Sequence, residues 1–406
     1  MRNIKRRIVV PAGVQRWLRP IRTACGIVTP LGRTILGFGL LAWIAGGVLG
    51  WHELLVAASA ALVLVIVACA FVVTRPALKC FVSFEPQRVV AGEAVAGEVK
   101  VTNRSTRRSL PATVELPVGG EMVVFDVPSL TASGVVDDVF VVHADKRGVI
   151  PIGPATSVRA DPIGLLHREV PSSKAYELIV HPRTVALEPF GSGLLRDLEG
   201  RATRDLSTSD LAFHALRDYA PGDDRRYVHW RSSARAGRLL VRQFHDTRRS
   251  TLCVIVDGRT SSYADPNEFE TAAEVAGSLS VRACKDQLSS TLLASTCKAE
   301  GSRPQVLLDA LARAALSQSI PAVEAQVTRV IAEGAQVSYG VLVSGSAVTP
   351  KELQRAASRF PLDVTTLVVR VAPTEKSSIR PGGRAPLLSL AKVEDLRGLL
   401  MSELSV

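Results

Sequence analysis

The chain has 406 residues and a formal net charge of +11, with 47% hydrophobic but only 5% aromatic residues. This length leaves room for two or three domains, and the hydrophobic content predicts membrane segments. The positive charge is concentrated at the start. Residues 1–33 contain eight Lys and Arg and no acid, whereas residues 80–406 contain 39 basic and 37 acidic residues. This distribution argues against a nucleic-acid-binding protein, whose folded domain would carry the basic surface.

Residues 1–33 are predicted to form a basic cytosolic arm that lies on anionic lipid of the inner leaflet. The six cysteines show no CxxC spacing. Free thiols in a reducing compartment are therefore expected, and no cysteine-based metal site.

Two apolar stretches follow within residues 34–79. Residues 34–50 and 54–73 are uncharged runs of 17 and 20 residues, separated by only three. Each is long enough to cross a bilayer as a helix, so the pair predicts a transmembrane hairpin. The basic residues before and after it predict that both termini and the main domains are cytoplasmic. An alternative is a cleaved signal peptide followed by one anchor.

Residues 80–185 contain short alternating stretches, punctuated by Pro, Gly and Asn. This pattern predicts an antiparallel β-sandwich. Within it, Asp161 precedes Pro162 and is interpreted as a turn former rather than a catalytic acid, and His167 as a surface residue.

Residues 186–250 contain the densest group of charged, aromatic and turn residues in the chain. Residues 194–209 are predicted to be a loop. Pro221-Gly222 predicts a turn, after which Asp223 or Asp224 caps a helix over residues 225–235 and a strand covers residues 239–244. The core position is favoured for Trp230. The candidate interaction residues are Arg217, Tyr219, Gly222, Asp223, Asp224, Arg226, His229, Trp230, Arg231 and Arg235.

Residues 251–406 alternate between apolar strands and amphipathic helices, which predicts a doubly wound α/β domain with a parallel sheet. The expected strands are 252–257, 290–294, 337–343 and 364–371, and the expected helices are 269–285, 306–316, 323–333, 351–360 and 390–401. Ligands of such folds bind at the carboxyl ends of strands, and Asp257 lies at one.

The segment Asp257-Gly-Arg-Thr-Ser261 resembles the Asp-x-Ser-x-Ser loop of von Willebrand factor type A domains. In that loop a carboxylate and two hydroxyls bind a divalent ion. Here Arg259 replaces the first serine, and a guanidinium cannot ligate a cation but can pair with Asp257. Asp257, Arg259 and Ser261 are therefore interpreted as a degenerate metal site, and no cofactor is expected.

The charged stretch within residues 186–250, together with two earlier segments, also carries a family resemblance. The whole chain from residue 35 onward is similar to the bacterial domain-of-unknown-function family 58. The resemblance implies a multi-pass protein of the bacterial plasma membrane, with a type A-like C-terminal domain, that works beside a MoxR-type AAA+ ATPase on a client protein complex. The residues that carry it are Arg147-Gly148, Asp161-Pro-x-Gly-Leu165, Arg217, Tyr219, Pro221-Gly-Asp-Asp224, Arg226, Val228-His-Trp230, Ala234-Arg235 and Gly237.

Three functions are compatible with these features. The favoured one is a membrane-anchored interaction platform that contacts the ATPase or its client. A hydrolase that uses Asp223, Asp224 and His229 is an alternative, since paired carboxylates beside an imidazole can do acid–base work. The sequence lacks the Gly-x-Ser-x-Gly, His-Glu-x-x-His and phosphate-loop motifs, so an enzyme is not expected. A scaffold that binds anionic lipid through residues 1–33 is the third.

Overall fold

The computed structural model describes residues 27–73, 78–189, 212–220, 225–245, 251–334 and 337–402. The chain forms two compact units. The first comprises Met1–Ala144 and Val149–Leu178, and the second comprises Asp145–Gly148 and Ile179–Val406. The predicted arm at residues 1–33 lies largely outside the described residues, as does the predicted loop at residues 194–209.

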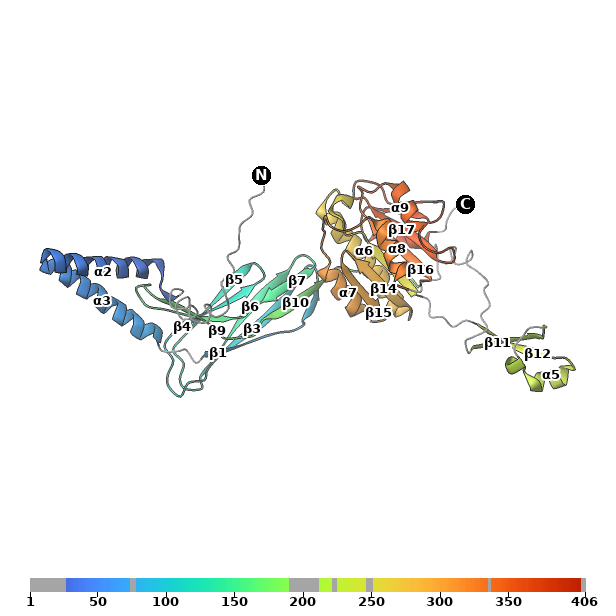
Figure 1. The fold of residues 1–406 in the computed structure, drawn as a ribbon. Helices are drawn as coiled ribbons and strands as arrows, with labels where there is room; N and C mark the ends of the chain where they lie inside the picture. The colour runs from blue at the N-terminus through green and yellow to red at the C-terminus, as the bar shows by residue number, and fades with distance from the viewer. Residues whose placement is uncertain are drawn as a thin grey trace. The chain divides into compact units, whose positions relative to one another are not determined.

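Two long apolar helices, α2 (Pro30–Leu49) and α3 (His52–Val73), run side by side as a hairpin (Figure 1). Thr29 caps α2 by accepting a hydrogen bond from the amide of Gly32, so the helix starts before the uncharged run that predicted it. Large apolar side chains such as Leu41 and Trp43 are more than 60% exposed. A helix of a soluble core would bury them. By length, composition and exposure, the pair is therefore compatible with a membrane anchor.

Most of the rest of the first unit consists of two β-sheets whose strands alternate between buried and exposed residues, as expected when one face of a sheet packs on a core. Phe84 and Tyr176 join the two sheets by an edge-to-face contact at 6.0 Å. The smaller sheet has the order β1 (Leu78–Phe84), β3 (Glu93–Asn103) and β6 (Val135–Ala144). The larger sheet has the order β2 (Arg88–Val90), β10 (Tyr176–His181), β7 (Gly148–Ile152), β4 (Ala112–Val118), β8 (Thr156–Ala160) and β9 (His167–Pro171), and β5 (Glu121–Val127) also pairs with β4.

The second unit contains a seven-stranded sheet whose five inner strands are parallel. The order is β15 (Cys297–Gly301), β14 (Ser289–Ala294), β13 (Thr251–Val256), β16 (Tyr339–Ser344), β17 (Thr365–Val371), β19 (Leu387–Leu390) and β18 (Ser378–Arg380). The chain leaves β13 toward β14 and later returns to its other side at β16. The carboxyl ends of β13 and β16 therefore form the switch point at which open α/β sheets bind ligands.

Helices cover both faces of this sheet (Figure 1). Alternate residues of β13 enter the two cores: Val254 packs with α6 (Pro266–Lys285), α7 (Pro304–Arg313) and α10 (Asp395–Met401). Ile255 packs on the other face with α8 (Val323–Ala332) and α9 (Pro350–Ala357). The prediction of one final helix over residues 390–401 is wrong at its start. Leu390 ends β19, and its side chain is buried in the first core.

Candidate functional site

The charged motif forms a small module of two strands and a helix. β11 (Ala212–Asp218) pairs antiparallel with β12 (Leu240–His245), and between them lie the 3₁₀ turn Arg225–Tyr227 and α5 (Trp230–Ala236). The single helix expected over residues 225–235 is therefore split. The split falls at Val228, whose bridge to Val241 holds the backbone extended and buries both side chains.

Two motif side chains tie α5 to its surroundings. His229 caps the helix, with Nδ1 accepting a hydrogen bond from the amide of Ser232 at 3.2 Å. Ser233 is buried, donates its hydroxyl to the carbonyl of His229 and accepts from the amide of Leu240. Gly237 ends α5 with φ of +66°, in the left-handed region that suits glycine. His229 thus supplies the cap of α5, and the expected caps Asp223 and Asp224 lie outside the described residues.

Of the remaining motif residues, Arg217 and Tyr219 are half-buried, and others are exposed or lie outside the described residues. Gly222, Asp223 and Asp224 are among the latter. Arg217 donates to the carbonyl of Asp218, and the amide of Tyr219 donates to Leu239. The core position expected for Trp230 is wrong: its side chain is 64% exposed. It is the first residue of the seven-residue helix α5, and Ser233 links that helix to the first residue of β12. Arg226, Arg231 and Arg235 are also exposed.

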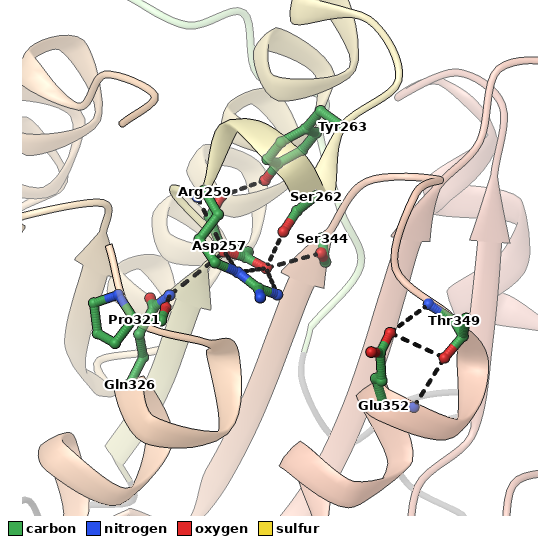
Figure 2. Close-up of polar contacts among 9 residues, drawn as sticks. All are labelled: Asp257, Arg259, Ser262, Tyr263, Pro321, Gln326, Ser344, Thr349 and Glu352. Carbon is green, nitrogen blue, oxygen red and sulfur yellow. Dashed lines mark hydrogen bonds and ion pairs between the residues drawn. The ribbon is translucent and has the colours of Figure 1, made fainter. Parts of the chain in front are cut away.

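A second polar cluster lies at the switch point of the α/β sheet. Asp257 follows β13 directly and is fully buried. Its Oδ2 accepts from Ser262 at 2.7 Å, from Arg259 Nη2 at 2.9 Å and from Ser344, at the end of β16, at 3.3 Å. Its Oδ1 accepts from the amide and Nε of Arg259 at 3.1 and 3.2 Å and from Gln326 at 3.4 Å (Figure 2).

These donors occupy the hydrogen-bonding capacity of the carboxylate, because a carboxylate offers about four lone-pair sites to accept hydrogen bonds. The hydrogen bonds that Arg259 donates to Asp257 raise the pKa of the guanidinium, which is therefore charged at neutral pH. Burial raises the pKa of Tyr263 well above its usual value, and its neutral hydroxyl donates to the main-chain carbonyl of Asp257 at 2.5 Å. The cluster therefore links the ends of β13 and β16 through a guanidinium and hydroxyls that converge on one buried carboxyl group.

The predicted role of Ser261 is wrong by one residue. The 3₁₀ turn Thr260–Ser262 directs Ser262 inward to Asp257, while Ser261 is exposed. Gln326 and Ser344 were not predicted, since they lie 69 and 87 residues from Asp257 in the chain. The position of Ser344 after an apolar strand was the only signal that could have found it. In the described parts of the chain, no group of three His, Cys, Asp or Glu side chains could hold a metal ion.

The segment Arg147-Gly148 also belongs to the second unit. Arg147 Nη1 donates to the carbonyls of Leu311 and Ala314 at the C-terminal end of α7, its Nε lies 3.0 Å from Glu270, and its guanidinium stacks over Phe269 at 4.6 Å. Burial lowers the pKa of Arg147, and Glu270 counteracts this by favouring the charged form. The helix dipole stabilises cations near the C-terminal end of a helix, so Arg147 is an anchor for that end of α7.

The loop that begins at Asp161 contacts both ends of the helical hairpin. Asp161 is buried and accepts from the amides of Ile163 and Leu166. Burial opposes its ionisation, but backbone donors that include Leu166, Leu165 and Ile163 outweigh this effect and lower its pKa. The folded loop presents the carbonyl of Leu165 to the amide of Thr29 at 3.0 Å. Asp161 therefore acts through the backbone, as a turn former that shapes the seat of α2.

The other end of the hairpin meets the same part of the first unit. Leu165 and Leu166 pack against Ala68 and Val72 of α3. Arg168 donates to the carbonyl of Val72 at 3.4 Å, at the end of that helix. His167, expected on the surface, lies 3.1 Å from Glu169 and is partly exposed. One short segment thus holds the start of α2 and the end of α3 together.

The fold defines a multi-domain protein with two apolar N-terminal helices, several antiparallel sheets and an α/β region. The family described as "Protein of unknown function DUF58" matches residues 215–327, from β11 to α8. This part of the chain is similar to the DUF58 family, and the matched stretch includes most of the motif module together with Asp257, Arg259 and Gln326. No curated protein matches the chain.

Several solved structures share limited similarity. The CARDB domain of a Pyrococcus furiosus protein is 15% identical over 25% of this chain and 91% of its own, with a TM-score of 0.21. The Pseudomonas fluorescens alkylpurine DNA glycosylase AlkC is 13% identical over 30% of this chain and 33% of its own, with a TM-score of 0.20. Red sea bream transglutaminase is 14% identical over 26% and 15%, with a TM-score of 0.19. These scores are too low to carry an argument about fold or function.

Proposed function

We propose that the chain is a membrane-anchored interaction platform that works with a MoxR-type AAA+ ATPase in the assembly or activation of a client protein complex. Residues 34–73 cross the plasma membrane twice, the basic residues 1–33 lie on anionic lipid, and both termini and the main domains are cytoplasmic. The α/β unit is von Willebrand factor type A-like. The proposal includes no enzymatic activity, no nucleic-acid partner and no cofactor.

The observation that carries this proposal is the exposure of Trp230. Its side chain is 64% exposed in a module in which His229 and Ser233 hold α5 in place, and exposed arginines lie beside it in the sequence. Tryptophan and arginine are the residue types that most often dominate binding energy at protein interfaces. An exposed tryptophan in the stretch that the family model matches is more simply explained by a partner than by folding.

The Asp257 centre supports a binding role over a catalytic one. Its carboxylate is buried and saturated by internal donors, and Arg259 supplies the positive charge that a divalent ion would otherwise bring. The hydrolase alternative requires Asp223 and Asp224, outside the described residues, and His229, whose Nδ1 caps α5. The described residues give that alternative no support.

The test is recovery of an AAA+ ATPase with the full-length protein from detergent-solubilised membranes. Trp230→Ala is expected to reduce recovery at least tenfold, because loss of a central aromatic anchor typically costs about 2 kcal/mol or more. Arg238→Ala is the matched control, since Arg238 is exposed in the same module and pairs only with Asp218 among the described contacts. Equal recovery with Trp230→Ala and the wild type, or no ATPase with either, would contradict the proposal.

A further inference from the structure

A groove lies on the second unit, between α9 and the turn from β18 to β19. Its volume is about 540 Å³, and Arg380 and Leu387, which are partners in the β18–β19 register, form one wall. The groove lies beyond residue 327, so the family match does not include it. Its lining residues are Pro350, Lys351, Gln354, Arg355, Ser358, Arg380, Pro381, Gly382 and Leu387.

Three of the lining side chains are cationic and none is acidic. Lys351 and Arg355 are one helical turn apart on α9, where like charges repel. Arg380 faces them from β18. In the described parts of the chain, these three exposed side chains make no hydrogen bond or ion pair. Elsewhere in the unit, Arg259, Arg282 and Arg370 are all paired with carboxylates. The groove thus concentrates three positive charges, and the carboxylate of Glu352, which interacts with Arg355, lies outside its lining.

The walls of the groove are held in place. Gln354 donates its Nε2 to the carbonyl of Ala385 at 2.7 Å, which ties α9 to the β18–β19 turn. The close approach requires glycine at position 382, because a Cβ there would lie 2.0 Å from that carbonyl and 2.3 Å from Gln354 Nε2. The Oε1 of Gln354 is buried and, among the described residues, has no donor. The groove therefore combines fixed walls, three cations and one acceptor that lacks a partner.

The residues that line the groove favour one class of anionic ligand over others. Phosphate groups are commonly bound by free amides at a helix N-terminus. At α9 the Thr349–Glu352 capping box already satisfies such amides (Figure 2). Bases of nucleic acids stack on aromatic side chains, and the lining has none. Pro350, Pro381 and Leu387 instead provide an apolar surface beside the cations, which fits an apolar side chain next to a carboxylate.

We propose that this groove binds an acidic peptide segment of a partner protein, with carboxylates on Lys351, Arg355 and Arg380 and a neighbouring apolar side chain on Pro350, Pro381 and Leu387. This inference rests on the proposed role as an interaction platform and adds a second contact surface with a defined ligand chemistry.

The experiment is a selection of random decapeptides on the full-length protein in detergent, beside a variant that carries Arg355→Glu and Arg380→Glu. Both arginines are exposed, so the variant is expected to fold, and its hydrogen exchange is compared with that of the wild type. The wild type should enrich peptides that contain Asp or Glu next to an apolar residue. The most enriched peptide, followed by fluorescence anisotropy at physiological salt, should bind the variant at least tenfold more weakly.

Controls separate charge in the groove from charge elsewhere. Lys392→Glu, at an exposed position outside the lining, should change the affinity less than twofold. Trp230→Ala should leave peptide binding unchanged, so failure of the groove and failure of the ATPase interaction are distinguishable. The inference is overturned if no acidic sequence is enriched, if the double variant enriches the same peptides, or if a single-stranded oligonucleotide binds the groove more tightly than the peptides.

Discussion

The guanidinium of Arg259 lies across the buried carboxylate of Asp257, with Nη2 2.9 Å from Oδ2 and Nε 3.2 Å from Oδ1. The two residues are separated only by Gly258, and both follow β13 at the switch point of the sheet. Open α/β sheets bind their ligands at this position. The chain therefore places its own cation where a ligand would otherwise lie, and this relationship can be tested by removing the cation.

Arg259→Ser should leave the buried carboxylate of Asp257 with fewer donors and place a hydroxyl beside it. The expected loss is about 1–3 kcal/mol of local stability, the usual cost of leaving a buried polar group unsatisfied. Hydrogen exchange of peptides from β13 and β16 should speed up accordingly. Addition of Mg²⁺ should restore protection, because a carboxylate with hydroxyl neighbours is a hard-oxygen ligand set.

The matched control is Arg259→Met, which removes the charge without adding a ligand. It should lose the same protection, and Mg²⁺ should not restore it. Protection of the wild-type peptides by Mg²⁺ at the same concentration would contradict the interpretation that Arg259 takes the place of the ion.

The sequence indicated Asp257 but not its surroundings. The sequence shows an acid directly after the apolar run of a predicted strand. Comparison with the Asp-x-Ser-x-Ser loop also shows that Arg259 replaces its first serine. Ser344 and Gln326 are brought to Asp257 only by the strand order and by α8, which composition does not reveal. The one-residue error at Ser261 arose because the 3₁₀ turn, rather than an extended loop, sets which hydroxyl points inward.

The motif module shows the same limit. Aromatic residues are usually buried, so a core position for Trp230 was a reasonable expectation. The structure instead leaves the indole exposed at the first position of the seven-residue helix α5. The capping role of His229 was also missed, because histidine is not among the preferred N-cap residues.

Arg147 provides a second prediction. Arg147→Met should destabilise the end of α7 by about 2–3 kcal/mol, because the carbonyls of Leu311 and Ala314 lose a charged donor and Phe269 loses its cation. Amide exchange of residues 304–316 measures the effect. Lys146→Met is the control, since Lys146 is adjacent and exposed, and it should leave that exchange unchanged. Equal exchange in the two variants would show that Arg147 does not anchor α7.

Two buried thiols provide a prediction on pH. Burial raises the pKa of Cys80 to about 11 and that of Cys253 to about 12. Unfolded thiols ionise near pH 8.5, so above this pH the unfolded state loses protons that the folded state keeps. Stability should therefore fall as the pH rises from about 8.5 toward 11.

Iodoacetamide labelling at pH 8, read by mass spectrometry, tests the same property directly. Cys80 and Cys253 should react at least 100-fold more slowly in the native protein than in urea, because both thiols are buried and protonated. Cys297 is only partly buried and should be labelled faster than either. Rapid labelling of Cys253 without urea would mean that the α/β core opens more readily than its packing indicates.

The contact between the helical hairpin and the Asp161 loop yields the last prediction. A Cβ at Gly32 would lie 2.2 Å from the carbonyl oxygen of Leu165 and 2.9 Å from Val28 Cγ1, so Gly32→Ala must displace backbone. That displacement weakens the hydrogen bond from the amide of Thr29 to Leu165 and costs about 1–3 kcal/mol, as overpacking typically does. Exchange of residues 161–168 in lipid nanodiscs should then rise about tenfold. Gly37 lies on the same helix with nothing within 4 Å of its Cβ position, so Gly37→Ala should leave that exchange unchanged. If both variants behave alike, the loop does not hold the hairpin, and the sheets of the first unit are joined to α2 and α3 only through the chain.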